Sequence, residues 1–458
     1  MSAFKEVEKM KILIVMHGAG SGGVEKSLRT LCKYINKDKF QVTVALPSEG
    51  PMKAYLDNLG IKTCITPIDS WTPIQFHFGE RHYYKFLSGL KERVHSIVDI
   101  IKQNEIDIVH SSTLSVADGA FAAMLAGRPH LWHIHGKSVG TLNTYGCYLP
   151  VEILYHLVKD LSGQLIAVSH DVSRFLELYI PGSNVPVIYN GLDIKEFDDF
   201  ARLPSMFRDE FGLKNKKVVA LVGRISGVKG IEDYIDSAEQ VLRIRKDAVF
   251  LIVGTDEDTK LAEAMKKKVR EMKLSEGIIF TGMRNDVPAL LRQADIFVCS
   301  SKAEGFSYSI VEAMAAAKPV VTTRCGGPEE IVIHGESGYH VDIGRPGQIA
   351  DAVQSLLGSD QLLKDMGNRS RQVLEQRFSA ENYAMNFEAV YLRLADDKRD
   401  VRSPWHEVIL DMASTVGHLG TRTSNLENEV RDLRNFEKSL KDNFVYRSIK
   451  NIVNSFKK

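Results

Sequence analysis

Short, almost uninterrupted apolar runs alternate with longer segments of helical periodicity along residues 1–190. Continuous apolar runs of this kind are typical of parallel strands that are covered on both faces. Strands that alternate with helices predict an α/β domain, doubly wound around a parallel sheet. The strands expected here are residues 12–16, 41–47, 61–66, 107–112, 130–136, 165–170 and 185–191.

The same alternation begins again after a break. Between residues 198 and 217 the strand pattern is lost and the chain is charged, which suits a linker and the first helix of another domain. Before this break Asn190 and Gly191 give a turn signal, and Asp193 can cap the helix that follows. A second set of strands is expected at residues 218–222, 250–255, 277–282, 294–299 and 319–323. The pattern predicts two doubly wound, Rossmann-like domains, residues 1–190 and 191–377.

A heptad pattern distinguishes the C-terminal part, residues 401–458. Leucines recur at every seventh position, and Glu437 interrupts the complementary row. The first row is Leu419, Leu426, Leu433 and Leu440, and the second is Val416, Thr423, Val430 and Phe444. This length is the minimum for a coiled coil, so we expect a homo-oligomer joined through residues 416–444. The alternative is a single amphipathic helix that packs on the rest of the chain.

The last residues, 441–458, combine five Lys or Arg with one Asp. Their apolar side chains, Val445, Ile449, Ile452 and Phe456, form a helical stripe beside these cations. Such a segment can lie in an anionic membrane surface, and it can equally continue an oligomer core.

Composition excludes several classes of protein. The formal net charge of +1 argues against a nucleic-acid-binding protein, and the five scattered cysteines, without a CxxC pair, fit a reducing compartment rather than a disulfide scaffold or zinc site. No apolar stretch approaches the ~20 residues of a membrane span, and the first apolar run is too short for a signal peptide. We therefore expect a cytoplasmic protein, peripheral at the inner face of the cell membrane if its tail binds lipid.

Glycines after the first strand spell GxGxxG, at Gly18, Gly20 and Gly23. A dinucleotide-binding protein would also need an acidic residue at the end of its second strand, and residues 45–48, ALPS, supply none. The loop can instead bring backbone amides close to a diphosphate or an acceptor at one side of a cleft.

Cations and carboxylates gather after strands of the second domain. Residues 218–222 lead to Gly223, Arg224 and Lys229, whose guanidinium and ammonium can hold a diphosphate. In residues 304–312, EGFSYSIVE, two glutamates flank a glycine turn and a helix start whose free N–H groups can bind a phosphate. Ser307 is the expected N-cap. The alternative is that all of these are ordinary solvated charges at loops and helix starts.

Two histidines, His133 and His135, flank Ile134 at the end of a predicted strand, where open α/β sheets bind ligands. By period-two alternation both point to the same face. A near-neutral pKa would suit either histidine to contact developing charge, while the alternative is a structural role for both.

The motifs EGFSYSIVE, GRISGVKG at residues 223–230 and GGPEE at residues 326–330 resemble the signature of family-4 retaining glycosyltransferases of GT-B fold. The resemblance covers residues 11 to about 395. It implies a hexosyltransferase that moves a sugar from a nucleotide sugar with retention of anomeric configuration, of the kind that builds bacterial surface polysaccharide such as lipopolysaccharide O-antigen. It also implies that a helix over residues 378–400 crosses back to the N-terminal domain.

Roles follow from the same resemblance. Arg224 and Lys229 would stabilise charge on the leaving nucleotide, Glu304 would face the donor sugar and Glu312 would bind the ribose hydroxyls. The expected catalytic residues are Arg224, Lys229, Glu304 and His135. The expected contacts with the nucleotide sugar are Gly22, Gly23, Gly223, Gly254, Gly305, Phe306, Ser307, Ser309, Ile310 and Glu312.

No Asp-x-Asp motif stands where a metal-dependent transferase would need one, and Asp198 with Asp199 is expected to cap a helix. We therefore predict transfer without a metal or other cofactor, with a UDP- or GDP-sugar as the donor substrate.

The acceptor is expected to be a glycan, and one aromatic segment is a candidate to contact it. Residues 70–91 hold Trp71, Phe76, Phe78, Tyr83, Tyr84 and Phe86, which suit a lipid surface or a sugar-stacking site, or else pin the loop to the core. Together with the tail, the segment suggests a lipid-linked glycan. A sugar-nucleotide epimerase of the same fold and an inactive coiled-coil scaffold remain as alternatives.

Overall fold

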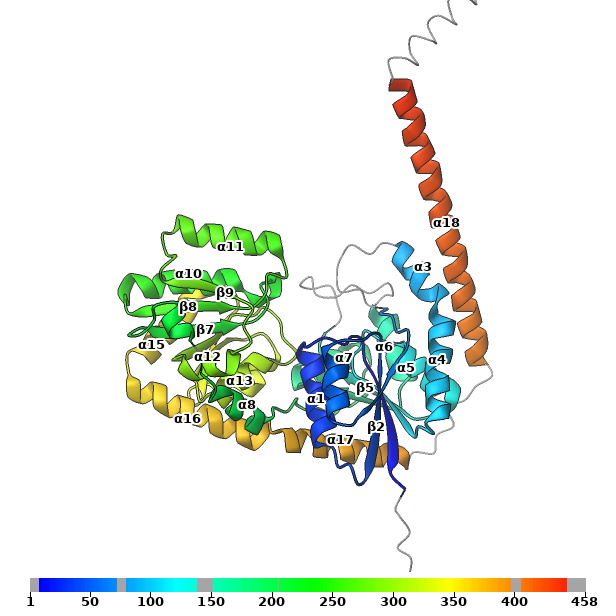
Figure 1. Ribbon diagram of the computed structural model, residues 1–458, viewed down its shortest axis with the longest axis horizontal. Helices are drawn as coiled ribbons and strands as arrows, with labels where there is room; N and C mark the ends of the chain where they lie inside the picture. The colour runs from blue at the N-terminus through cyan, green and yellow to red at the C-terminus, as the bar shows by residue number, and fades with distance from the viewer. Residues whose placement is uncertain (1–7, 72–79, 138–150, 205, 397–404, 443–458) are drawn as a thin grey trace, which may run out of the picture.

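The computed structural model describes residues 8–71, 80–137, 151–204, 206–396 and 405–442. They form two parallel six-stranded sheets, flanked by helices and lying side by side (Figure 1). The strand orders are β3-β2-β1-β4-β5-β6 and β12-β11-β10-β7-β8-β9, so both sheets follow one topology. In each sheet the order reverses beside its first strand, which creates the crevice where open α/β sheets bind ligands. The predicted fold class is confirmed.

The first sheet explains the uninterrupted apolar runs. Ile12 and Ile14 of β1 are fully buried in one core, and Leu13 and Val15 are fully buried in another on the opposite face. The strands are β1 (Met10–Val15), β2 (Phe40–Leu46), β3 (Lys62–Ile65), β4 (Ile108–Ser111), β5 (His130–Ile134) and β6 (Gln164–Ala167). The helices are α1 (Gly23–Tyr34), α2 (Pro51–Asn58), α3 (Glu80–Ser88), α4 (Leu90–Gln103), α5 (Asp118–Ala126), α6 (Val151–Asp160) and α7 (His170–Tyr179).

The second sheet repeats this arrangement. Val218 and Ala220 of β7 lie in one core, and Val219 and Leu221 lie in the other. The strands are β7 (Lys217–Val222), β8 (Ala248–Val253), β9 (Ile278–Gly282), β10 (Ile296–Cys299), β11 (Val320–Thr323) and β12 (Gly338–Val341). The helices are α8 (Ile194–Ala201), α9 (Phe207–Glu210), the short 3-10 turn η1 (Gly227–Lys229), α10 (Ile231–Ile244), α11 (Thr259–Glu271), α12 (Val287–Gln293), α13 (Tyr308–Ala315), α14 (Gly327–Ile331), α15 (Pro346–Leu357) and α16 (Asp360–Arg377).

Two strand predictions were wrong. Residues 185–191 form no strand, and only Val187 makes an isolated bridge, to Ala167. Pro186 lacks the N–H that a ladder would need, which explains why pairing stops there. The short edge strand β12 was missed because its sequence, GYHV, lacks a continuous apolar run.

Two chain segments cross between the domains side by side. Leu192 donates its N–H to the Phe378 carbonyl at 2.9 Å, and Ala380 donates to the Leu192 carbonyl at 3.1 Å. A Cβ on Gly191 would lie 2.6 Å from the Ser379 carbonyl oxygen, so only glycine permits this contact. As expected, Asp193 caps the next helix, α8: its side chain accepts a hydrogen bond from the Glu196 amide at 2.8 Å.

Helix α17 (Ala380–Ala395) packs on the first domain, below α1 in Figure 1. Its Tyr383 hydroxyl shares a 2.5 Å hydrogen bond with Ser27, and its Tyr391 hydroxyl one of 2.7 Å with His110 of β4. This packing supports the proposal that the chain divides at about residues 190 and 377 and returns through a crossover helix.

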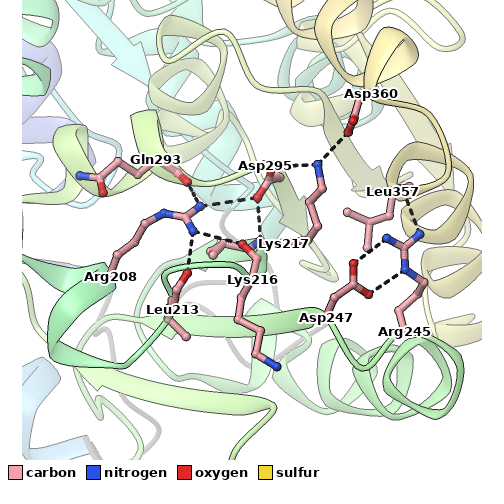
Figure 2. Close-up of polar contacts among 11 residues, drawn as sticks. Arg208, Leu213, Lys216, Lys217, Arg245, Asp247, Gln293, Asp295, Leu357 and Asp360 are labelled. Atoms are coloured by element: carbon pink, nitrogen blue, oxygen red, sulfur yellow. Dashed lines mark hydrogen bonds and ion pairs between the residues drawn. The ribbon is translucent and has the colours of Figure 1, made fainter.

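A polar cluster holds the start of the second domain against the amino-terminal ends of its central strands, β7 and β10 (Figure 2). Asp295 accepts a hydrogen bond from the Val218 amide at 2.7 Å. Arg208 of α9 donates to the Gln293 carbonyl at 2.6 Å. The cluster lies at the beginning of β7 and therefore leaves the opposite, carboxyl edge free for a ligand.

The C-terminal helix α18 (Trp405–Asp442) packs with its first half against α3 and α4, and its second half extends away from the domains (Figure 1). The basic stripe predicted within residues 441–458 lies almost wholly outside the described residues. Within the described parts of the chain, no helix has the length and apolar character needed to cross a membrane.

Candidate functional site

The two domains meet at the carboxyl ends of their sheets. On the first domain, the glycine loop follows β1, and Gly22 is the N-cap of α1. A Cβ on Gly22 would lie 2.8 Å from the Glu25 carboxylate, which is buried beneath the loop. A Cβ on Gly23 would lie 3.6 Å from the ring of Tyr308, in the second domain. The Gly22-Gly23 pair therefore faces the other domain, as the cleft position predicted for it requires.

On the second domain, the site follows β7 and β10, the neighbouring strands at the crevice. After β7 comes Gly223, whose carbonyl oxygen would lie only 2.0 Å from a Cβ on Gly254. Gly254 also has a φ of 152°, which other residues rarely adopt. These two glycines bring the ends of β7 and β8 together and keep the crevice floor free of side chains.

Lys229 and Glu304 form an ion pair in this crevice. Their side chains are 20% and 14% exposed, so the pair is largely withdrawn from water. Ser301 donates a 2.9 Å hydrogen bond to the same Glu304 oxygen. Burial alone would lower the Lys229 pKa, but the attraction of Glu304 outweighs it and raises that pKa above its usual value. Lys229 is therefore a charged ammonium at neutral pH, beside a carboxylate that a ligand can replace.

Arg224 points elsewhere. Its guanidinium pairs with Glu257, and its side chain is 59% exposed. Sequence spacing predicted that Arg224 and Lys229 hold the same group, but of these two cations only Lys229 lies in the crevice. Arg224 would have to leave Glu257 to reach a diphosphate there.

Glu312 lies on α13 and pairs with Lys26 of α1, across the domain boundary. The Glu312 side chain is 11% exposed. A pocket of about 130 Å³ lies beside this pair, lined by Arg29, Tyr55, Pro288 and Tyr308 among others. Sequence reasoning missed Lys26. Its only signal was a row of cations on one face of α1: Lys26, Arg29 and Lys33.

The start of α13 departs in one detail from the prediction. Ser307 occupies the N-cap position, but its hydroxyl makes no capping hydrogen bond and instead contacts the Ser309 hydroxyl at 3.1 Å. The amides of the first turn are therefore left without a side-chain cap. The Ile310 side chain is fully buried, so only its backbone could meet a ligand.

Gly305 brings the two domains into contact. A Cβ on Gly305 would lie 2.2 Å from the His135 carbonyl oxygen, a distance that no real side chain tolerates. The neighbouring Phe306 packs against Tyr308 and Phe378, with ring centroids 5.7 and 5.9 Å away. The loop that carries Glu304 thus touches the strand end that carries His135.

His133 and His135 do point to the same face, with ring centroids 3.9 Å apart. His133 is 1% exposed and packs against Phe387 of α17, which makes it a core residue. His135 is only partly buried, and its Nε2 is a buried nitrogen without a hydrogen-bond partner among the described residues. Both ring nitrogens of His133 also lack a partner among the described residues, so it is the partial exposure of His135 that favours it over the buried His133 as a ligand contact.

The near-neutral pKa expected for these histidines is wrong. Burial in the first domain lowers the pKa of His135 to about 3, and that of His133 well below its usual value. Both rings are therefore neutral at physiological pH. His135 can donate or accept a hydrogen bond, but it is not a cation there.

Carboxylates and histidines form no cluster with metal-ligand spacing anywhere in the described chain. The prediction that Asp198 and Asp199 cap a helix was wrong, because both lie inside α8. Asp198 pairs with both terminal nitrogens of Arg371 at 2.8 Å, which fastens α8 to α16.

The aromatic segment is pinned to the core where it is described. Trp71 stacks on Trp132 at a centroid distance of 5.8 Å and donates a 2.7 Å hydrogen bond to the Leu114 carbonyl. Phe86 is 3% exposed, and Tyr84 contacts α18. Phe76, Phe78 and the side chain of Tyr83 lie outside the described residues. For Trp71 and Phe86 the structural alternative therefore holds.

Two family models match the chain, one on each domain. The Glycosyltransferase Family 4 model matches residues 21–196, and the Glycosyl transferases group 1 model matches residues 206–373. The chain belongs to the family-4, group 1 glycosyltransferases. It is thus a retaining, nucleotide-sugar-dependent transferase of GT-B fold, which confirms the resemblance read from the motifs.

Similar proteins come from several bacteria. The N-acetyl-alpha-D-glucosaminyl L-malate synthase of Bacillus anthracis is 28% identical over 268 residues, 58% of this chain and 68% of that protein. The UDP-Gal:alpha-D-GlcNAc-diphosphoundecaprenol alpha-1,3-galactosyltransferase of Escherichia coli is 23% identical over 398 residues, 85% of this chain and 98% of that protein. The crystal structure of Anabaena Alr3699/HepE in complex with UDP-glucose shares the fold, with a TM-score of 0.69, 23% identity, and coverage of 84% of this chain and 100% of that one.

Proposed function

We propose that this glycosyltransferase moves a hexose from a UDP- or GDP-sugar to a lipid-linked glycan, without a metal ion. The observation that carries the donor part is the largely buried pair of Lys229 and Glu304 at the crevice of the second sheet. From the first domain, the Gly22-Gly23 loop meets Tyr308, and His135, whose Nε2 has no partner among the described residues, lies against Gly305 beside Glu304. A diphosphate between these walls would meet one ammonium, backbone amides and little water.

In this proposal the donor replaces contacts that the protein now makes with itself. The diphosphate takes the Lys229 ammonium, with the amides of Ser309 and Ile310, and Glu304 turns to hydroxyls of the sugar. Ribose hydroxyls donate to Glu312 in place of Lys26. Glu304 and Glu312 each exchange an ammonium donor for hydroxyl donors, and Lys229 exchanges a carboxylate for a phosphate. Lys26, whose side chain is 40% exposed, is left to water, so no charge is left buried without a partner.

Sugar transfer requires the site to stabilise the negative charge that develops on the leaving nucleotide as the glycosidic bond breaks. Lys229, the free amides at the start of α13 and Arg224, once released from Glu257, would supply that stabilisation. His135, neutral at physiological pH, would position the sugar through a hydrogen bond. Retention requires that the new bond form on the same face of the sugar as the old one.

Donor binding is tested by thermal unfolding of the full chain with UDP-, GDP-, ADP- and dTDP-sugars. A ligand that binds only the folded protein stabilises it by about 2.7 kcal/mol at one hundred times its Kd, which raises Tm. We expect a rise with one UDP- or GDP-sugar and with the matching free nucleotide diphosphate. The absence of a shift with every donor would instead favour an inactive scaffold.

A lipid-linked acceptor is supported by the acceptor in the name of the Escherichia coli relative, a diphosphoundecaprenol-linked sugar, and by the basic stripe in residues 441–458. That stripe would hold the enzyme on the anionic inner face of the cell membrane, where such acceptors reside.

Deletion of residues 441–458 is expected to move the enzyme from the membrane pellet to the supernatant after cell lysis. The reason is the loss of five cations and four apolar anchors. Transfer to a water-soluble acceptor analogue should be unchanged, because the residues proposed for the donor site all lie between positions 22 and 312. A truncated chain that sediments like the full chain would contradict membrane binding by the tail.

Self-association through the C-terminal helix is also part of the proposal. Its support is the exposure of Val416, Leu419, Leu426 and Leu433 on α18.

A further inference from the structure

Helix α18 has two faces of different character. Small or buried residues pack against the first domain: a Cβ on Gly417 would lie 2.2 Å from the Ser88 nitrogen, and one on Gly420 would lie 2.1 Å from the Tyr84 ring. Large apolar side chains point away from that contact and are between 47% and 66% exposed. They are Met412, Val416, Leu419, Leu426, Val430 and Leu433. The helix therefore meets its own enzyme through one face and leaves an apolar stripe on the other.

The stripe follows a heptad repeat. With Val416 and Val430 at position a, the leucines 419, 426 and 433 fall at position d. The residues against α3 fall at the outer positions b, e and f, so docking on the enzyme leaves a and d free. Valine at a with leucine at d favours two parallel strands over larger assemblies. Residues 412–433 would give a contact between the two helices, the seam, that is about 33 Å long.

Charges beside the stripe distinguish the possible orientations. In a parallel, in-register pair, each g residue faces the e residue of the partner's next heptad, so Arg422 meets Glu427 and Glu429 meets Arg434. Symmetry doubles both contacts. These four side chains are exposed and have no ion-pair partner among the described residues. An antiparallel pair with the same apolar layers would match Arg422 with Glu429 and leave Glu427 opposite Gly420.

We propose that two copies of this chain associate through residues 412–433 of α18 in a parallel, in-register, two-stranded coiled coil. The two glycosyltransferase heads then lie at the same end of the seam, and the C-terminal ends of both α18 helices lie at the other. This inference gives the geometry of the self-association proposed above, and it does not depend on the donor chemistry.

The mass of the full chain in solution, measured by size exclusion with light scattering, tests the association. We expect twice the single-chain mass of 51.3 kDa. Leu426→Glu places a charge in the seam and should return the single-chain mass, while Asn425→Glu places the same charge outside the seam and should not. Leu426 is 53% exposed in the chain, so its replacement does not disturb the fold. A single-chain mass for the unaltered protein, or a dimeric Leu426→Glu, would overturn the proposal.

Charge exchange tests the orientation. Glu427→Arg should raise the dimer dissociation constant about tenfold, because it faces Arg422 of the partner twice. Adding Arg422→Glu should restore the original constant. In the antiparallel pair Glu427→Arg would change little and Arg422→Glu would weaken the dimer, so that result would refute the parallel register. The donor-induced Tm rise should persist in monomeric Leu426→Glu, which separates this inference from the proposed activity.

Discussion

Replacement of Lys229 by alanine is expected to lower kcat/KM for sugar transfer by roughly 10²–10³-fold, the usual effect of removing one group that stabilises developing negative charge. Two effects act together. The ammonium that meets the diphosphate is lost, and the Glu304 carboxylate, 14% exposed, remains in the crevice without its counter-ion. That carboxylate would repel the donor, so the donor-induced rise in Tm should also disappear.

A second variant separates these two effects. Lys229→Ala with Glu304→Gln removes both charges of the pair and should recover the stability that the unpaired carboxylate costs. Transfer should stay low, because no ammonium has been restored. If the double variant regained normal transfer, Lys229 would serve only to neutralise Glu304. Lys260→Ala, which removes an exposed cation of the same domain, is the matched control and should change neither the rate of transfer nor the stability.

The free energy of unfolding of this protein is expected to fall steeply as the pH is lowered. Burial lowers the pKa of His110, His130 and His135 to about 3, and that of His133 well below its usual value. The unfolded chain takes up protons on these histidines near pH 6.5, whereas the folded chain does not. Stability is therefore complete above that pH and falls as the pH falls toward the folded values. Below about pH 6 each histidine lowers the free energy of unfolding by about 1.4 kcal/mol per pH unit, or roughly 5.5 kcal/mol per pH unit for the four.

The measurement is the free energy of unfolding by urea at closely spaced pH values between 7 and 5. His133→Gln removes one titrating group from the core and should lower the slope by one proton, about 1.4 kcal/mol per pH unit, whatever it does to stability at pH 7. His418→Gln makes the same replacement at an exposed position of α18, away from this core, and is the matched control. An unaltered slope in His133→Gln would show that this ring protonates in the folded protein.

The acid effect bears on function because the histidines lie behind the site. His110 is hydrogen-bonded to Tyr391 of α17, and His133 packs on Phe387 of the same helix. Protonation there would loosen the helix that joins the second domain to the first. We therefore expect loss of transfer in acid to follow loss of the crossover packing rather than titration of His135 in the crevice.

Local patterns were enough to predict the fold class. A strand covered on both faces must be apolar at every position, as Ile12 to Val15 show, and that run is visible without the structure. The two errors in the strand prediction have local causes too. Pro186 has no N–H to donate to a neighbouring strand, and β12 is short and lacks a continuous apolar run. The glutamates, glycines and lysine of the site could be picked out for the same reason, since their spacing within each loop and helix start is a property of the sequence.

The tertiary structure decided where those side chains point and what they meet. Lys26 and Glu312 are 286 positions apart in the chain, so no spacing rule could pair them. The exposed position of Arg224 beside Glu257, the burial of Trp71 on Trp132 and the lowered pKa of His135 likewise depend on neighbours brought by the fold. The sequence by itself determined the two domains and the set of chemical groups, because strand burial and motif spacing are local. Only the folded chain decided which groups share the crevice, because side-chain contact and desolvation arise from packing between distant segments.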